Sequence, residues 1–177
     1  SCVLYVGTTN AGSNSSTLHM TTPRITSCEV AGGFYSWNVT CTDLAGNVFG
    51  SVARTITIDA VAPSVNARVP VANNWTNDNT TTFEFNYTDS LSPNASCILY
   101  VGTANVGSNS STLNKTNTQI TSSEVADGTY SWNVTCTDLA GNTLGSTART
   151  ITIDAAPPAV NAESPASNAW TSDTTPD

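Results

Sequence analysis

Charged side chains are scarce in this sequence, and basic ones are the scarcest. Five Lys and Arg face 13 Asp and Glu among 177 residues, which gives a formal net charge of -8. A nucleic-acid partner is not expected, because phosphate binding needs clustered Lys and Arg. The same shortage disfavours an anionic membrane surface. Membrane insertion is not expected either, because no apolar run approaches the ~18 residues of a membrane span.

The chain also lacks the 3.6-residue apolar period of an amphipathic helix. Val, Ile, Phe, Tyr and Trp recur instead in short alternating runs, and Thr is abundant. β-Branched and aromatic side chains pack well on a pleated surface, so this pattern favours strands. The predicted fold class is therefore all-β.

An internal repeat dominates the sequence. Residues 2–8 match residues 97–103, and residues 35–47 are identical to residues 130–142, without a gap at an offset of 95 (97 − 2 = 95). Self-similarity at a fixed period indicates an array of like units. The period is close to the ~100 residues of an immunoglobulin-type sandwich, so each repeat is expected to bury its own core.

The boundary between repeats is predicted at residues 59–63, where a proline stiffens a short connector after an alternating strand. Residues 1–60 are then the later part of one immunoglobulin-like repeat, residues 61–155 a complete second repeat, and residues 156–177 the start of a third. This arrangement fits a window cut from a longer repetitive chain. It also fits subunits that complete one another by lending strands.

About seven strands are expected in residues 61–155. Phe83, Phe85 and Tyr87 alternate with polar residues and should face the core. Tyr130 belongs to a strand that also places a tryptophan, a valine and a cysteine on one face. The main strands are expected at residues 63–69, 82–88, 97–102, 118–122, 130–136 and 148–154.

Two segments are expected to lie outside these main strands. Residues 73–78 are rich in Asn and have turn chemistry. Residues 103–116 are irregular in pattern, with a short edge strand expected near residues 111–113. Both segments should therefore add little to the two sheets.

The residues of the repeat support a family resemblance. The pattern Gly-x-Tyr-x-Trp-x-Val-x-Cys-x-Asp-x-Ala-Gly-Asn occurs at residues 33–47 and 128–142, and Arg-Thr-Ile-Thr-Ile-Asp follows in both copies. With the Pro-led strand and Asn-x-Trp-Thr that come next, it resembles the bacterial and archaeal immunoglobulin-like repeats of large cell-surface proteins. The version with Cys-x-Leu-Tyr upstream is similar to repeats of archaeal surface and S-layer-associated proteins. The resemblance implies an immunoglobulin-like fold and an extracellular location, but fold alone does not settle function.

Four of the five cysteines form two pairs with the same spacing. Cys2 and Cys41 lie 39 residues apart (41 − 2 = 39), and so do Cys97 and Cys136 (136 − 97 = 39). One disulfide per repeat is predicted, between the third and sixth strands, and buried free thiols are the alternative. Zinc is disfavoured, because each repeat keeps two Cys and no shared His. Cys28 has no counterpart, so we expect an idle thiol, with an intermolecular bridge as the alternative.

Nine Asn-x-Ser/Thr motifs are candidate N-glycosylation sites, which is a modest excess over what the composition yields. Asn86 and Asn133 fall on the outward phase of strands, and Asn94 and Asn109 fall in predicted loops. Most acceptors should therefore be accessible, and plain polar surface is the alternative. The acceptors are Asn14, Asn38, Asn74, Asn79, Asn86, Asn94, Asn109, Asn114 and Asn133.

A calcium site at the junction between repeats is one interpretation of the clustered acidic residues. In the predicted topology, the loop between the last two strands lies near the preceding domain. Asp138 and Asn142 would then approach the linker residue Asp59 and also Asp89. Such oxygen ligands suit calcium, which would stiffen the array. The simpler alternative is a tight turn in which Asp138 and Asn142 make local hydrogen bonds, with no cofactor.

Catalysis is not expected, and no catalytic residue is assigned. The single histidine, His19, aligns with Asn114 in the second copy, so no repeated triad can use it. No Gly-rich phosphate loop follows a strand and opens a helix. The carboxylates shared by the copies lie in separate turn regions, which disfavours a glycosidase pair.

The predicted function is a structural component of an extracellular filament, stalk or surface layer. Its partners would be other copies of itself, arranged head-to-tail or by strand complementation. An adhesin or glycan-binding repeat region is the first alternative, with Trp75 and Trp170 as candidate contacts to surface glycans. A spacer of a surface-anchored hydrolase is the second.

Overall fold

A computed structural model describes residues 1–16, 22–163, 167–172 and 174. No helix occurs in these ranges, so none is long and apolar enough to cross a membrane. His19 lies outside the described residues. The strands are β1 (Cys2–Val6), β2 (Thr9–Asn14), β3 (Gly33–Thr42), β4 (Val48–Gly50), β5 (Arg54–Ile58), β6 (Ser64–Val69), β7 (Asn74–Thr76), β8 (Thr82–Thr88), β9 (Asn94–Val101), β10 (Ala104–Leu113), β11 (Asn117–Thr121), β12 (Gly128–Asp138), β13 (Thr143–Gly145) and β14 (Arg149–Ile153).

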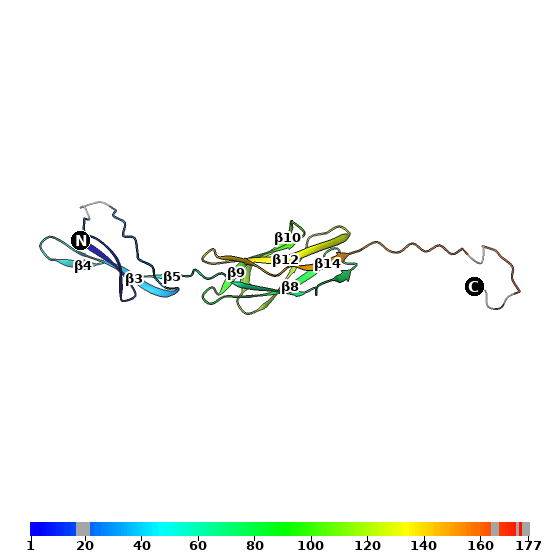
Figure 1. Cartoon of the computed structure of the whole chain (residues 1–177), viewed down its shortest axis with the longest axis horizontal. Coiled ribbons are helices and arrows are strands. Elements are labelled where there is room, and N and C mark those ends of the chain that lie inside the picture. The colour runs from blue at the N-terminus through cyan, green and yellow to red at the C-terminus, as the bar shows by residue number, and fades with distance from the viewer. Residues whose placement is uncertain (17–21, 164–166, 173, 175–177) are drawn as a thin grey trace.

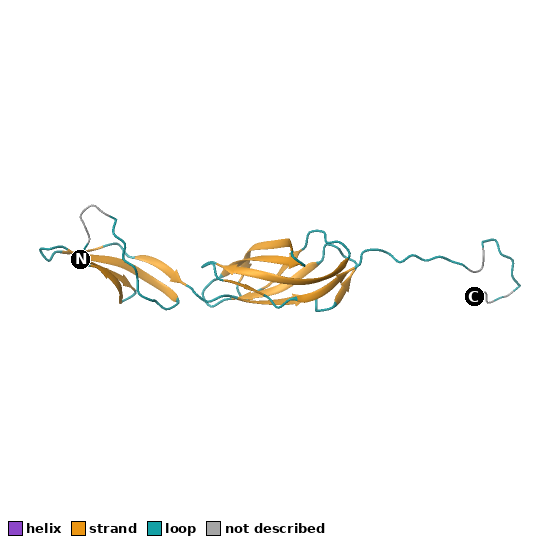
Figure 2. Cartoon of the chain, turned by 45° about the horizontal axis from the view of Figure 1, so that its top comes forward, coloured by secondary structure: helices purple, strands orange, loops and turns teal. Residues whose placement is uncertain are grey.

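Strands β6 to β14 build a two-layer sandwich. One sheet has the order β10-β9-β12-β14-β7, with β13 paired to β12, and the facing sheet has the order β11-β8-β6. The strands of both layers run along the long axis of the molecule (Figure 2). Figure 1 shows β1 to β5 beyond one end of this sandwich and an extended C-terminal segment beyond the other. The fold class is therefore all-β, with an immunoglobulin-like sandwich.

The core of the sandwich lies between its two sheets. Phe83, Phe85 and Tyr87 of β8 are all 0% exposed, as their alternation with polar residues predicts. Trp132 of β12 is also 0% exposed, and its ring meets that of Phe83 edge to face, with centroids 4.8 Å apart. Each such side chain stabilises the fold by about 1.5–3 kcal/mol through burial.

Residues 1–60 form a single described sheet, with the order β2-β1-β3-β4 and β5 paired to β3. Its strands are the repeat counterparts of β9, β10, β12, β13 and β14. Among the described residues of this half, no second sheet covers the apolar face. Trp37 and Leu4 are consequently part-exposed, whereas their counterparts Trp132 and Leu99 are 0% exposed. The uncovered face forms a groove of about 510 Å³.

Two expectations about strands are wrong. The segment 73–78, expected to be a turn, contains β7, in which Trp75 lies opposite Thr152 of the parallel strand β14. The short edge strand expected near residues 111–113 is the end of β10, which has 10 residues and two register shifts against β9. Backbone pairing therefore overrides the weak strand preference of both segments, with the distant β14 for β7 and with the preceding strand β9 for β10. The sandwich has nine strands rather than seven (β6 to β14).

Candidate functional site at the domain junction

Three carboxylates converge where residues 1–60 meet the sandwich. Asp59 follows β5 in the linker, Asp89 follows β8, and Asp138 ends β12. One carboxylate oxygen from each lies within 4.8 Å of the other two. The structure thus brings together the three acidic residues that the sequence analysis placed at a junction site.

The fourth predicted residue, Asn142, connects the turn after β12 to the linker. Asp138 Oδ1 accepts hydrogen bonds from the backbone N–H groups of Ala140 and Asn142, both at 2.8 Å. Asn142 Nδ2 donates to Asp138 Oδ2 at 2.9 Å and to the carbonyl oxygen of Asp59 at 3.1 Å. The local turn is therefore present, and the acidic residues converge beside it.

The other two carboxylates are each held by one oxygen only. Asp89 Oδ1 accepts hydrogen bonds from the backbone N–H groups of Leu91 and Ser92, both at 2.8 Å. Asp59 Oδ1 accepts one from Val61 N at 3.1 Å. The Oδ2 atoms of Asp59 and Asp89 are buried and have no hydrogen-bond partner. Such an oxygen is unusual, because buried polar atoms are nearly always paired.

The cluster creates a strongly negative local field. Asp89 is 9% exposed and Asp138 is 6% exposed. Burial, together with the nearby carboxylates of Asp89, Asp138 and Asp59, raises the pKa of Tyr87 to about 12. Burial also pushes the pKa of Asp138 upward, but hydrogen bonds led by those from Asn142 outweigh it and lower that pKa below its ordinary value. Within the described part of the chain, none of the three carboxylates forms an ion pair.

The turn itself is repeated in residues 1–60. Asp43 Oδ1 accepts hydrogen bonds from Ala45 N at 2.9 Å and Asn47 N at 2.8 Å, and Asn47 Nδ2 donates to Asp43 Oδ2 at 2.8 Å. The side-chain hydrogen bond from Asn47 is the main cause of a lowered pKa at Asp43. The turn is thus a property of each repeat, whereas the three-carboxylate cluster needs a linker and a neighbouring loop as well.

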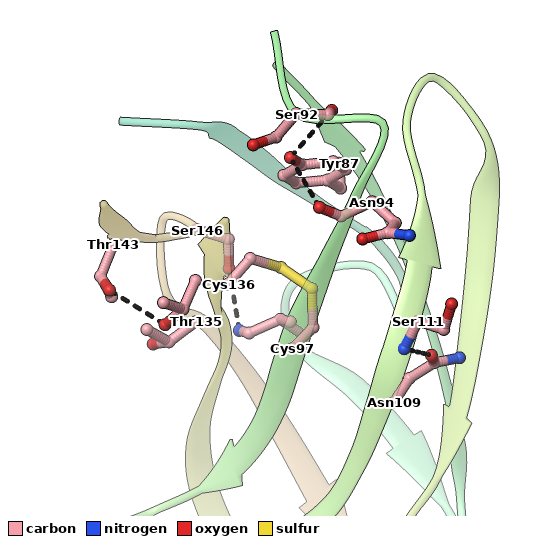
Figure 3. The surroundings of a disulfide bond; sticks show 12 residues. Tyr87, Ser92, Asn94, Cys97, Asn109, Ser111, Thr135, Cys136, Thr143 and Ser146 are labelled. Carbon is pink, nitrogen blue, oxygen red and sulfur yellow. Dashed lines mark hydrogen bonds between the residues drawn. A yellow bond between two sulfur atoms is a disulfide. The ribbon is translucent and has the colours of Figure 1, made fainter. Parts of the chain in front are cut away.

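Sequence reasoning placed Tyr87 only in the core and missed its place beside the acidic cluster. Its hydroxyl donates to the carbonyl oxygens of Ser92, at 3.3 Å, and Asn94, at 3.4 Å (Figure 3). Asn114 was considered only as a glycan acceptor. Its Nδ2 donates to the carbonyl oxygens of Asp89, at 2.7 Å, and Ser92, at 3.1 Å. The role of Asn114 has no local sequence signal, because its partners lie 25 and 22 residues away along the chain. Tyr87 donates to nearby carbonyls, but Asp59 and Asp138 reach it from distant parts of the chain.

Each repeat contains a disulfide, Cys2–Cys41 in the first and Cys97–Cys136 in the second. Cys97 and Cys136 lie directly opposite each other in β9 and β12, with Cα atoms 4.1 Å apart (Figure 3). The bridge therefore joins neighbours within one sheet, whereas the antibody bridge joins the two sheets. Cys28 is exposed and forms no disulfide.

The candidate glycan acceptors are all part-exposed. A glycan would be attached at Nδ2, and in Asn114 this atom already donates to the two carbonyls described above. Asn79 Nδ2 donates to Glu124 at 3.0 Å. Of the two candidate glycan-contact residues, Trp75 is 71% exposed on β7 and Trp170 is 100% exposed. Glycosylation remains a prediction.

Two facing sheets and an intra-sheet disulfide define an immunoglobulin-like β-sandwich domain. The sequence profile of the family described as "Bacterial Ig-like domain" matches residues 65–155, which is just over half of the chain. The chain belongs to this family. A comparison with curated proteins finds no match.

Among solved structures, the chain is similar to the fibronectin(III)-like modules of Clostridium thermocellum CbhA, at 17% identity over 86% of this chain and 75% of that chain, with a TM-score of 0.48. It is also similar to SGBP-B of the Bacteroides ovatus mixed-linkage glucan utilization locus, a structure in complex with mixed-linkage heptasaccharide. That likeness has 17% identity, 86% and 38% coverage of the two chains and a TM-score of 0.28. Both scores are low, so family membership rests on the sequence profile.

Proposed function

We propose that this chain is a structural segment of an extracellular filament, stalk or surface layer built from tandem immunoglobulin-like repeats. The observation that supports this most directly is the course of the chain. It enters the sandwich of residues 61–155 at one end and leaves at the opposite end (Figure 1). Repeats joined in this way extend a chain lengthwise and leave its lateral surface free for packing.

The division into domains is part of the same proposal. Residues 61–155 form one complete repeat, residues 1–60 the later part of a preceding repeat, and residues 156–177 the start of a following one. The two disulfides support an extracellular location, because such bonds persist mainly in oxidising compartments.

Other copies of the chain are the proposed partners, head-to-tail or by strand complementation. The open face of residues 1–60 lacks the strands that β6 and β8 supply to the complete sandwich. Residues 159–163, the described part of the counterpart of β6 (64 + 95 = 159), are exposed and form no strand. One chain thus has both an exposed segment that corresponds to a strand of the sandwich and an uncovered apolar face, which supports strand complementation between copies.

Immunogold electron microscopy tests the proposed location and assembly. Antibodies raised against residues 61–155 should label intact cells, along filaments or in a surface layer, because the epitope is outside the cell in a regular assembly. Labelling confined to the interior of sectioned cells, or to isolated soluble particles, would contradict the proposal.

Glycan binding is a second candidate, favoured by the position of Trp75. A tryptophan beside a turn commonly closes the end of a core, but this one is 71% exposed on β7. On a glycan array, binding by the wild-type chain should fall at least tenfold in Trp75→Ala. Val71→Ala, which shortens a nearby apolar side chain that is 61% exposed, is the matched control and should bind normally. A chain that binds no glycan removes this candidate.

A further inference from the structure

We propose that Asp59, Asp89 and Asp138 together bind one calcium ion, which fixes the linker against the sandwich of residues 61–155. This inference deepens the proposed role in an array of repeats, and its consequence, a stiffer array, rests on that proposed role. The site itself rests on the geometry of three carboxylates.

The cluster concentrates negative charge in a small volume. Three carboxylates with oxygens mutually within 4.8 Å repel one another, and burial weakens the screening that water would provide. Among the described residues, no Lys or Arg pairs with any of them. The cluster comes from three separate segments, so local turn geometry alone does not explain its convergence. A bound cation would offset the repulsion.

Two carboxylate oxygens of the cluster have no hydrogen-bond partner among the residues that the structure describes. Backbone N–H groups orient Asp59 and Asp89 through their Oδ1 atoms, and the Oδ2 atoms of both are buried without a partner. Asp89 is only 9% exposed, so water has little access to it. Leaving a buried polar atom unsatisfied costs about 1–3 kcal/mol, and more for a charged group. A single metal ion would be coordinated by both oxygens at once.

The donor set selects the kind of metal. All three side chains offer carboxylate oxygen, and neither Cys nor His is among them, which favours a hard cation over zinc or copper. Calcium ligands lie about 2.3–2.6 Å from the ion, so two of them can be as far apart as about 4.6–5.2 Å. The observed limit of 4.8 Å falls in that span. Magnesium is disfavoured because it gives up its waters reluctantly and demands near-ideal octahedral geometry.

Asp59 lies in the linker, so a calcium ion bound to it would stiffen the joint between two repeats. Asn142 Nδ2 already donates to the carbonyl of Asp59, and a calcium ion would add a second, stronger link between the linker and the loops after β8 and β12. Asp154 and Asp43 are the repeat counterparts of Asp59 and Asp138. Two of the three ligand positions therefore recur in the repeat, and calcium would stiffen each junction at which all three ligands meet.

Calorimetric titration of the chelator-treated full chain with calcium chloride tests the site. One saturable site is expected. Asp89→Asn and Asp59→Asn should each weaken binding at least tenfold, because each removes a ligand charge. Glu163→Gln, on the exposed C-terminal segment, makes the same charge change away from the cluster and should bind like the wild type. Asp59 lies in the linker outside both sheets, so Asp59→Asn remains informative if Asp89→Asn fails to fold.

Protease cleavage within residues 59–63 tests the consequence. Calcium should slow it at least tenfold in the wild type and leave it unchanged in Asp59→Asn. No saturable binding, binding unaffected by both Asp variants, or equal affinity for magnesium overturns the calcium site. Cleavage indifferent to calcium overturns its role in the joint. These measurements need only the purified chain, so their failure is distinguishable from a failure of the proposed surface location.

Discussion

The pKa of Tyr87 depends strongly on the groups that surround its hydroxyl. Its ring is fully buried, its hydroxyl donates to two backbone carbonyls, and three carboxylates are near enough to act on it electrostatically. Burial and those carboxylates raise the pKa of Tyr87 to about 12 from an ordinary 10.0. The folded state therefore keeps the phenol proton at a pH at which the unfolded chain has lost it.

Alkaline titration in the absence of divalent cations should reveal this residue. A raised folded-state pKa contributes stability below pH 10 that is lost as the pH rises from 10 to 12. The free energy of unfolding should fall by about 2 kcal/mol more in the wild type than in Tyr87→Phe over that range. Urea unfolding at a series of pH values measures both. Equal pH dependence in the two proteins would show that Tyr87 does not titrate in this way.

At the scale of elements, the two disulfides provide an internal comparison. Both join paired strands and close loops with the same sequence separation of 39, so chain entropy favours them equally, by about 4 kcal/mol. Their surroundings differ, however. Cys97 and Cys136 are 0% exposed beneath β6 and β8, whereas Cys41 lies part-exposed on the open face of residues 1–60.

Graded reduction should therefore break the Cys2–Cys41 bridge first. A reductant reaches Cys41 directly, but it reaches Cys97–Cys136 only when the sandwich opens. Alkylation and mass spectrometry after mild dithiothreitol treatment should show labelled Cys2 and Cys41 at least tenfold earlier. In 6 M urea, where the sandwich is unfolded, the two bridges should be reduced at similar rates. A difference that persists in urea would point to a cause other than burial.

The elements also show how far sequence reasoning reaches. β8 and β14 were predictable because alternating apolar residues report a half-buried strand, and the two Cys pairs were predictable from the repeat. β7 was not, because Asn74, Trp75 and Thr76 lack that alternation and are held by backbone pairing with the distant β14. Similarly, topology predicted that Asp138 and Asn142 would approach two further residues, Asp59 and Asp89. The burial of their Oδ2 atoms depends on packing at the joint, which no local pattern encodes.

At the scale of the whole molecule, the repeat predicts what residues 1–60 need to form a sandwich. In the complete repeat, residues 61–95 supply β6, β7 and β8, and residue 96 is the counterpart of Ser1. A second copy of residues 61–95 fused directly before Ser1 would therefore be in register. Its aromatic strand should cover the groove of about 510 Å³ and bury Trp37 as Trp132 is buried.

Amide hydrogen exchange of residues 1–60 measures the effect of that fusion. Exchange in β1 and β3 should slow at least tenfold relative to the parent chain, because closing a second sheet over them makes local opening costly. The control replaces both Phe83 and Phe85 by Asp in the added copy only. It has the same length and nearly the same sequence, but charged side chains cannot enter an apolar core without a large desolvation cost. Protection that is equally strong in the control would mean that the added segment acts without docking on this face, and the repeat would then not be a self-contained folding unit.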